Sequence, residues 1–305
     1  MHGSLSLRAG VLYVGRHADT AHVRAYDLDG VPLGAGFSFR ARDGHGGARV
    51  DGLAVDRDRT LWIADRASSS VRVFSVFGRE SGGIEFLRGA PPSDTRGGED
   101  RRGDLSGICD VALLEDSAEE APGEDRLLVT CGGTRRHGLA IARLDGTWVR
   151  GLRPEGHPLG HFRGLTRAKA HGRWIFACES GAGRVQVFRD GEFHFSFCVP
   201  GPGGGRLEPA AAAPLADGRW VLALRGATSA LVVVDAGGRV VRTLAEAGRD
   251  TGAVDSPEDV VVEPASDLSA TRIAVLDRDA ERVQVFTVEG RCYGALEPLP
   301  GELGS

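Results

Sequence analysis

Short runs of Val, Ile, Leu and Phe alternate with clusters of glycine and polar residues along the whole chain, and no run has helical periodicity. The clearest example is the stretch 53–78, which divides into predicted strands at Leu53–Asp56, Leu61–Asp65 and Val71–Phe77. Turn-forming polar residues separate these strands. The same triplet returns at 259–290, and a weaker copy lies at 164–191. A strand triplet that recurs along a chain indicates a repeat architecture.

The repeat has six copies, which align best on the third strand of each unit. The aligned residues are Val23, Val71, Leu139, Val185, Leu231 and Val283, separated by 48, 68, 46, 46 and 52 residues. A glycine follows each of these strands, as a hairpin turn with positive φ requires. Second strands such as Trp220–Leu224 are apolar throughout, which fits sheets packed on both faces.

These features predict an all-β protein, a six-bladed β-propeller of four-stranded antiparallel blades. We expect one domain over residues 1–305, with blades at about 4–40, 50–88, 105–152, 162–199, 207–245 and 257–297. A pair of β-sandwich domains is the main alternative, but it does not explain the regular spacing. Two polar segments, Pro91–Asp104 and Glu115–Asp125, interrupt the repeat, and we expect them to be surface loops.

Three units resemble NHL repeats. They combine an acidic residue at the end of the second strand with an Arg-Val-Gln-Val-Phe-like third strand: Asp65 with 71–74, Glu179 with 184–188, and Asp277 with 282–286. The resemblance implies the propeller fold but leaves function open, because such propellers include lyases, lactonases, RNA binders and scaffolds. NHL-type propellers usually pair an N-terminal strand into the last blade. Here the first unit has four strands of its own, so either side-chain packing closes the ring or our first blade is one strand out of phase.

Composition adds limits on function. The net charge of −5 gives no general attraction to nucleic acid or anionic membranes, and no apolar run reaches the roughly 20 residues of a membrane-spanning helix. Five cysteines without a CxxC motif argue against a disulfide framework or structural zinc, so we expect a cytoplasmic protein. Lys169 is the only lysine among 37 basic residues, a bias that GC-rich codon usage explains.

Functional residues are expected on one face of the propeller. The first strand begins, the second ends and the third begins at the same edge of each blade, which we call the upper face, and the longer loops lie there. This placement indicates the candidate binding residues. They are Asp51, Arg66, Arg135, Arg136, His161, Arg163, Glu179, Arg225, Glu258, Asp259 and Arg278. Such a mixed ring of acids and arginines could bind a zwitterionic ligand or a charged peptide, although Glu179–Arg184 and Asp277–Arg282 have the spacing of structural ion pairs within a blade.

The sequence favours neither a metal site nor a nucleic-acid site. Six histidines map to the upper edge, namely His17, His22, His45, His137, His157 and His161. Only His161 lies just before an inner strand, so we expect loop histidines and no metal or cofactor. The Arg135–Arg136 pair lacks the neighbouring aromatics that stacking on RNA needs.

The sequence therefore favours a propeller that binds a protein or peptide through its upper face. The alternative is a small-molecule lyase or hydrolase with its site at the mouth of the central channel. An enzyme should show polar side chains that converge in the channel, whereas a scaffold should show a filled channel and a charged or apolar rim.

Overall fold

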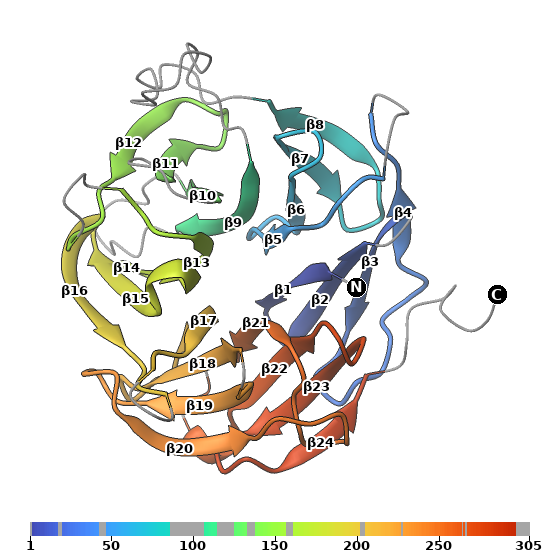
Figure 1. The fold of residues 1–305 in the computed structure, drawn as a ribbon. Coiled ribbons are helices and arrows are strands. Elements are labelled where there is room, and N and C mark those ends of the chain that lie inside the picture. The colour runs from blue at the N-terminus through green and yellow to red at the C-terminus, as the bar shows by residue number, and fades with distance from the viewer. Residues whose placement is uncertain are drawn as a thin grey trace.

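The computed structural model describes residues 2–17, 20–42, 47–85, 107–114, 125–132, 138–156, 161–201, 205–226, 228–263, 265 and 267–296. These residues form six separate antiparallel sheets of four strands each, and every sheet uses four strands that are consecutive in the sequence. Figure 1 shows the sheets arranged as blades around a central axis. The predicted six-bladed propeller of four-stranded blades is confirmed.

The first strand of each blade lies innermost, beside the channel, and the second strand pairs with it (Figure 1). The inner strands are β1 (His2–Arg8), β5 (Gly52–Val55), β9 (Ile108–Leu114), β13 (Leu165–His171), β17 (Glu208–Pro214) and β21 (Pro257–Val262). The second strands are β2 (Val11–His17), β6 (Thr60–Asp65), β10 (Arg126–Cys131), β14 (Trp174–Glu179), β18 (Trp220–Arg225) and β22 (Arg272–Asp277).

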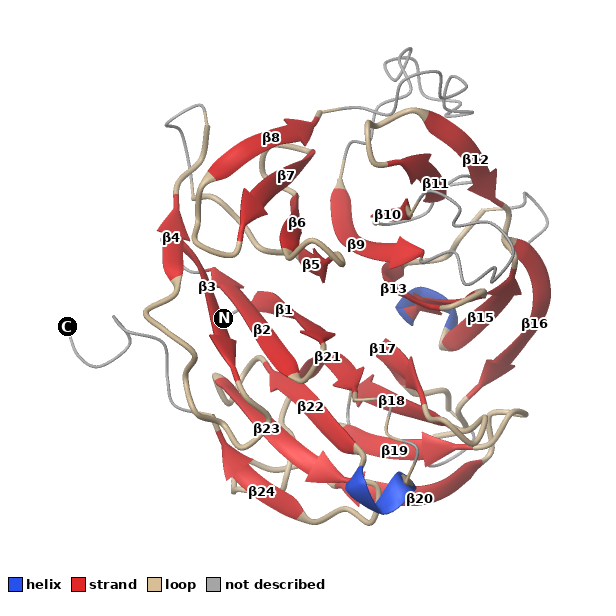
Figure 2. Cartoon of the chain, turned by 180° about the vertical axis from the view of Figure 1, so that it is seen from behind, coloured by secondary structure: helices blue, strands red, loops and turns tan. Residues whose placement is uncertain are grey.

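The third and outer strands complete the blades, and two short 3-10 helices accompany them (Figure 2). The third strands are β3 (Ala21–Tyr26), β7 (Ser70–Ser75), β11 (Leu139–Arg143), β15 (Arg184–Arg189), β19 (Ala230–Val234) and β23 (Arg282–Thr287). The outer strands are β4 (Phe37–Phe39), β8 (Glu80–Ile84), β12 (Trp148–Leu152), β16 (Glu192–Cys198), β20 (Val240–Ala245) and β24 (Cys292–Ala295). The 3-10 helices are η1 (Ser180–Ala182) and η3 (Leu268–Ala270), and among the described residues no helix is long and apolar enough to cross a membrane.

The hydrophobic core is divided among the interfaces between neighbouring blades. All six residues used to align the repeat lie in third strands and are buried. Side chains of β14 and β15, for example, pack with those of β18 and β19 in one cluster. Because both faces of each sheet are covered in this way, the strands lack the alternation of a half-exposed sheet.

The ring closes by side-chain packing, with no exchange of strands among the described residues. The last core cluster joins Leu5, Leu12 and Tyr26 of the first blade to Leu276 and Val283 of the last. The strand β1 pairs with β2, and the outer strand β24 pairs with β23. Of the two possibilities left open by the sequence, packing closes the ring and the first blade is in phase.

The glycine after each third strand has a second role in this packing. All six have positive φ: Gly30, Gly78, Gly146, Gly191, Gly238 and Gly290. A Cβ at Gly78 would lie 2.5 Å from a ring atom of Phe37, which belongs to the outer strand of the preceding blade. The same approach recurs around the ring, and a Cβ at Gly30 would lie 3.1 Å from Leu296 beyond the last blade. Glycine is therefore required for blade-to-blade contact as well as for the turn.

Candidate functional site

The central channel contains two cavities, one at each end. The upper cavity, which we call the vestibule, has a volume of about 300 Å³ and is lined by residues where inner strands begin, including His2, Asp51 and Glu258. The lower cavity has a volume of about 480 Å³ and is lined by the ends of the inner strands, including Arg8, His171 and Glu263. Arg167 lines the vestibule and Lys169 lines the lower cavity, so the two cations of β13 lie between the two spaces.

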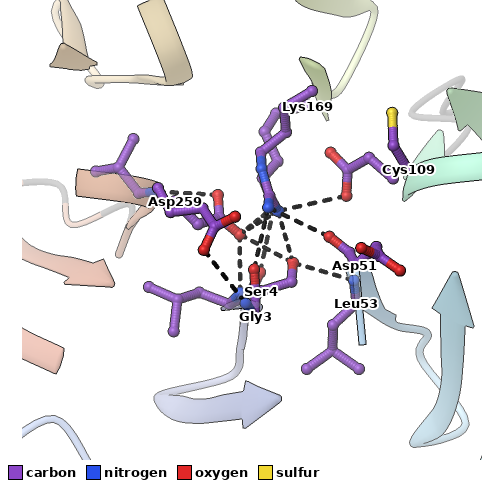
Figure 3. Close-up of polar contacts among 12 residues, drawn as sticks. Gly3, Ser4, Asp51, Leu53, Cys109, Lys169 and Asp259 are labelled. Atoms are coloured by element: carbon purple, nitrogen blue, oxygen red, sulfur yellow. Dashed lines mark hydrogen bonds and ion pairs between the residues drawn. The ribbon is translucent and has the colours of Figure 1, made fainter. Parts of the chain in front are cut away.

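Five largely buried polar residues meet in the channel, and we call them the channel network: Ser4, Asp110, Arg167, Lys169 and Asp259. Figure 3 shows Ser4, Lys169 and Asp259 of this group. One guanidinium nitrogen of Arg167, Nη1, donates to Asp259 Oδ2 at 2.7 Å and to Ser4 Oγ at 2.8 Å. The other, Nη2, donates to the backbone carbonyls of Gly3 at 3.1 Å and Asp51 at 3.2 Å. Arg167, which lies in the fourth blade, thus contacts the inner edges of the first and second blades and Asp259 in the inner strand of the last blade.

Asp259 gathers the remaining donors of the network (Figure 3). Its Oδ2 accepts hydrogen bonds from Lys169 Nζ at 3.0 Å, from Ser4 Oγ at 2.9 Å and from the Leu5 N–H at 2.8 Å. Burial by itself would raise the pKa of Asp259, but Arg167 and Lys169 hold it below the usual range. Asp259 is therefore an ionised carboxylate inside the protein.

The second carboxylate of the channel network, Asp110, is less well paired. Its Oδ2 accepts a hydrogen bond from the Ala168 N–H at 3.2 Å, while Oδ1 is buried without a hydrogen-bond partner and lies 3.6 Å from Arg167 Nη1. Burial raises the pKa of Asp110 to about 6, against the opposing effect of Lys169 and Arg167. Two cations and two carboxylates therefore balance one another, which is the condition for burying such groups.

The channel network has a clear structural role. An inner strand pairs on one side only, so the N–H and C=O groups of its other edge face the channel and need partners. Side chains of the network supply them: Ser4 Oγ accepts from the Leu53 N–H at 3.1 Å, and Lys169 Nζ donates to the Leu5 carbonyl at 3.2 Å. The polar groups that converge in the channel are thus engaged with one another and with strand edges.

The acidic candidates for the upper-face ring are mostly buried or already paired. Asp259 belongs to the channel network. Glu179 is fully buried, where it binds Arg184 and accepts from Gln186 Nε2 at 2.6 Å, as the spacing predicted for a pair within the blade. Glu258 hydrogen-bonds His2 at 2.9 Å, and burial, which would raise its pKa, is outweighed by His2 and Arg167, which lower it.

Asp51 is the remaining acidic candidate and lies at the rim of the vestibule. Its carboxylate is 3.4 Å from Arg49 Nε and accepts from the Arg66 N–H at 3.0 Å. Burial raises the pKa of Asp51, while Arg49 and the Arg66 N–H oppose the rise. The structure also confirms the second within-blade pair, Asp277 with Arg282, at 3.7 Å.

The basic candidates differ from the acidic ones because several have no partner among the described residues. No described side chain pairs with the guanidinium groups of Arg66, Arg163 or Arg225, whereas Arg278 hydrogen-bonds Asp279 at 2.7 Å. Arg66 and Arg225 line the vestibule, while Arg163 is exposed on the rim. Arg135 and Arg136 lie outside the described residues, as do Pro91–Asp104 and positions 115–124. Among the described candidates, the charged groups without a side-chain partner are therefore positive.

The histidines do not converge. His17 is buried, its Nδ1 accepts from the Val50 N–H at 3.1 Å, and burial together with Arg49 lowers its pKa to about 4. His22 bonds Ser38 Oγ at 2.7 Å, and His161 is half-buried. His45, His137 and His157 lie outside the described residues. Within the described part of the chain, no group of three His, Cys, Asp or Glu residues is placed to hold a metal ion.

Cys109 is the one thiol that lines the vestibule, and it is not poised as a nucleophile. Its Sγ donates to the Thr166 carbonyl at 3.1 Å, and burial, reinforced by Asp110, raises the pKa of the thiol far above neutrality. A thiol of this kind stays protonated and inert. The vestibule is therefore better suited to binding an anion than to nucleophilic chemistry.

Ser4, Asp110, Arg167 and Lys169 were not among the sequence-based candidates. A local signal existed in β13, where Arg167 and Lys169 alternate with Ala168 and Ala170 and therefore share one face of an inner strand. The isolated lysine was a second signal, because codon usage accounts for the many arginines but not for where the one lysine lies. The partners come from blades far apart in the sequence, and no local pattern links them.

Comparisons with known proteins support the propeller fold but identify no family. No protein-family model and no curated protein sequence matches the chain, so the NHL likeness remains a resemblance of the repeats. The chain is similar to the WD40 β-propeller domain of Doa1, with 14% identity, a TM-score of 0.54, and coverage of 97% of this chain and 82% of that one. It is also similar to a chain in the crystal structure of a nidogen/laminin complex, with 13% identity, a TM-score of 0.61, and coverage of 94% and 93%. A protein of unknown function from Bacteroides caccae matches with 14% identity, a TM-score of 0.53, and coverage of 94% and 92%.

Proposed function

We propose that this propeller is a protein- or peptide-binding module and that its upper face receives an acidic segment of the partner. Likeness to a chain in the structure of the nidogen/laminin complex supports a binding role, because that structure is of a complex between proteins. Fold alone does not assign function, so the proposal rests on the chemistry of the upper face.

The observation that carries the proposal is the imbalance between acids and arginines on this face. The acidic candidates are engaged: Glu179 with Arg184, Glu258 with His2, and Asp259 with Arg167. The guanidinium groups of Arg66, Arg163 and Arg225 have no partner among the described residues. Arginine offers carboxylates two parallel hydrogen bonds, and it is enriched at the energetic centres of protein interfaces.

The same face does not favour a nucleic acid. A phosphate backbone is a continuous polyanion, whereas Asp51 and Glu258 lie at the start of inner strands beside the available arginines. A peptide whose acidic residues are separated by neutral ones can place its carboxylates on the arginines and keep them away from these two acids. The proposal therefore names a peptide segment with spaced acidic residues.

The test uses an array of immobilised peptides of three classes: acidic, basic, and neutral with apolar residues. Native protein should bind the acidic class. The triple variant Arg66→Ser, Arg163→Ser and Arg225→Ser should bind it at least about a hundredfold more weakly if each arginine contributes about 1–2 kcal/mol. Binding to no class, or equal binding of native protein and variant, would overturn the proposed role of this face. Thermal melting provides the control, since replacing two exposed arginines and one half-buried arginine, none of which has a described side-chain partner, should change the melting temperature by a few °C at most.

A further inference from the structure

We propose that the vestibule is an anchoring pocket for a single carboxylate side chain, an aspartate or glutamate of the partner, and that Arg225 is the residue that binds it. This inference rests on the proposed function and makes it specific. It assigns a site, a ligand group and a principal residue within the upper face.

The first step is the charge lining the vestibule. Four arginines line it, namely Arg49, Arg66, Arg167 and Arg225, against two carboxylates, Asp51 and Glu258. Arg49 lies 3.4 Å from Asp51, and Arg167 is committed to Asp259 at 2.7 Å on the floor. After these pairs are formed, Arg66 and Arg225 remain against one carboxylate, Glu258, so the vestibule keeps an excess of positive charge.

The second step concerns Arg225, the last residue of β18. It is half-buried, and no described residue accepts a hydrogen bond from its guanidinium. Burial lowers the pKa of Arg225. The carboxylate of Glu258 opposes this, the positive charges of Arg278 and Arg167 add to it, and Glu208, opposite Arg225 in the sheet, opposes it more weakly. An arginine stays charged in proteins, so the cost of this position persists until an anion pairs with it.

The third step is the size of the space. A volume of about 300 Å³ corresponds to about ten water molecules. The carboxylate and methylene groups of one acidic side chain fit such a space, but a folded domain or a duplex does not. Partial desolvation strengthens an arginine–carboxylate contact compared with one on an open surface.

The experiment uses a fluorescein-labelled peptide in which glutamate alternates with serine, and its glutamine counterpart, in fluorescence-anisotropy titrations. We expect the glutamate peptide to bind native protein, Arg225→Gln to weaken it by about tenfold or more, and Arg225→Lys to weaken it less, because lysine keeps the charge and loses the two-pronged contact. Arg249→Gln is the matched control, since Arg249 already pairs with Asp255 at 2.8 Å and does not line the vestibule. It should change the dissociation constant by less than about threefold.

The outcomes separate this inference from the proposed function. If Arg225→Gln and Arg249→Gln weaken binding of the glutamate peptide equally, the vestibule is not the anchor, although the upper face still binds acidic segments. If the glutamine peptide binds as well as the glutamate peptide, the carboxylate chemistry is wrong. If acetate or inorganic phosphate binds tightly to the vestibule and no peptide does, the ligand is a free anion and a partner's side chain is ruled out. If Arg225→Gln fails to fold, the comparison of Arg225→Lys with native protein decides the matter, and equal affinity there overturns the assignment.

Discussion

At the residue scale, the protein places its one lysine and a fully engaged arginine on the channel axis. Lys169 bonds Asp259 and the Leu5 carbonyl, and Arg167 bonds Asp259, Ser4 and two backbone carbonyls. Each contact supplies a hydrogen-bond partner that an inner-strand edge or a buried charge would otherwise lack. The channel network therefore holds blades together at the centre, where apolar packing between sheets does not reach.

Replacing Arg167 by methionine should destabilise the protein strongly. The change would leave Asp259 and Asp110 with only Lys169 as a cationic partner, and removing one member of a buried pair costs about 3–5 kcal/mol. Urea denaturation should show this loss in the free energy of unfolding. Arg163→Met, at an exposed rim position of the same blade, should change it by less than about 0.5 kcal/mol. A loss below about 1 kcal/mol for Arg167→Met would mean that the network does not stabilise the ring.

Replacing Asp110 by asparagine should alter how stability depends on pH. Burial raises the pKa of Asp110 from 3.8 to about 6, so the folded state holds a proton more tightly than the unfolded state does. The stability contributed by this carboxyl is fully present below about pH 4 and is lost as the pH rises through about 6. Asparagine cannot ionise, and its carbonyl can still accept from Ala168.

The measurement is the free energy of unfolding of both proteins at about pH 4 and about pH 7.5. The stability of Asp110→Asn relative to native protein should rise between these values by about 2–3 kcal/mol, as a shift of about two pKa units implies. A difference that stays constant across this range would show that Asp110 has an ordinary pKa in the folded protein.

At the element scale, the blades were predictable because their signals are local. Apolar second strands, the spacing of Glu179 from Arg184, and the glycine after each third strand all lie within one blade. What the sequence did not indicate is that these glycines also contact the preceding blade, since that contact joins residues from different repeats. The turn at Gly78 and the ring of Phe37 meet only after both blades have formed.

Two glycines with the same φ can distinguish the requirement for positive φ at a turn from the requirement for close contact with the preceding blade. Gly78 and Gly218 both have a φ of +83°, but a Cβ at Gly78 would lie 2.5 Å from Phe37, whereas a Cβ at Gly218 would have nothing within 4 Å. Gly218→Ala should cost about 1–2 kcal/mol for left-handed backbone. Gly78→Ala should cost about 1–3 kcal/mol more, because the outer strand β4 must shift. Equal losses in chemical denaturation would show that the glycine serves only the turn.

The site was less predictable than the blades. The rim arginines could be chosen from their positions in the repeat, and Arg66, Arg163 and Arg225 are indeed without described partners. The accessibility of the acids could not be judged, because burial of Asp259 depends on Arg167, two blades away in the ring. Local patterns give the strand on which a residue lies, but the six inner strands together determine which charges meet in the channel.

At the scale of the whole molecule, the ring is closed by packing, the channel is divided by a neutral network, and an uncompensated positive charge remains at the upper end. These features together support the proposed binding face at the upper end. The lower cavity has Lys169 at its inner end, but that amine is already engaged with Asp259. The central claim is therefore that ligands with carboxylates meet this protein at the upper face.

Hydrogen–deuterium exchange of native protein, with and without the peptide of alternating glutamate and serine, tests this claim most directly. Bound peptide should slow exchange at the starts of the inner strands, around Asp51, Leu165 and Glu258, and at the end of β18 around Arg225. Exchange at the opposite ends of the inner strands, around Gly10, Gly172 and Glu263, should stay unchanged. Slower exchange at the lower ends alone, or none at either end while the peptide is bound, would contradict the assignment of the upper face.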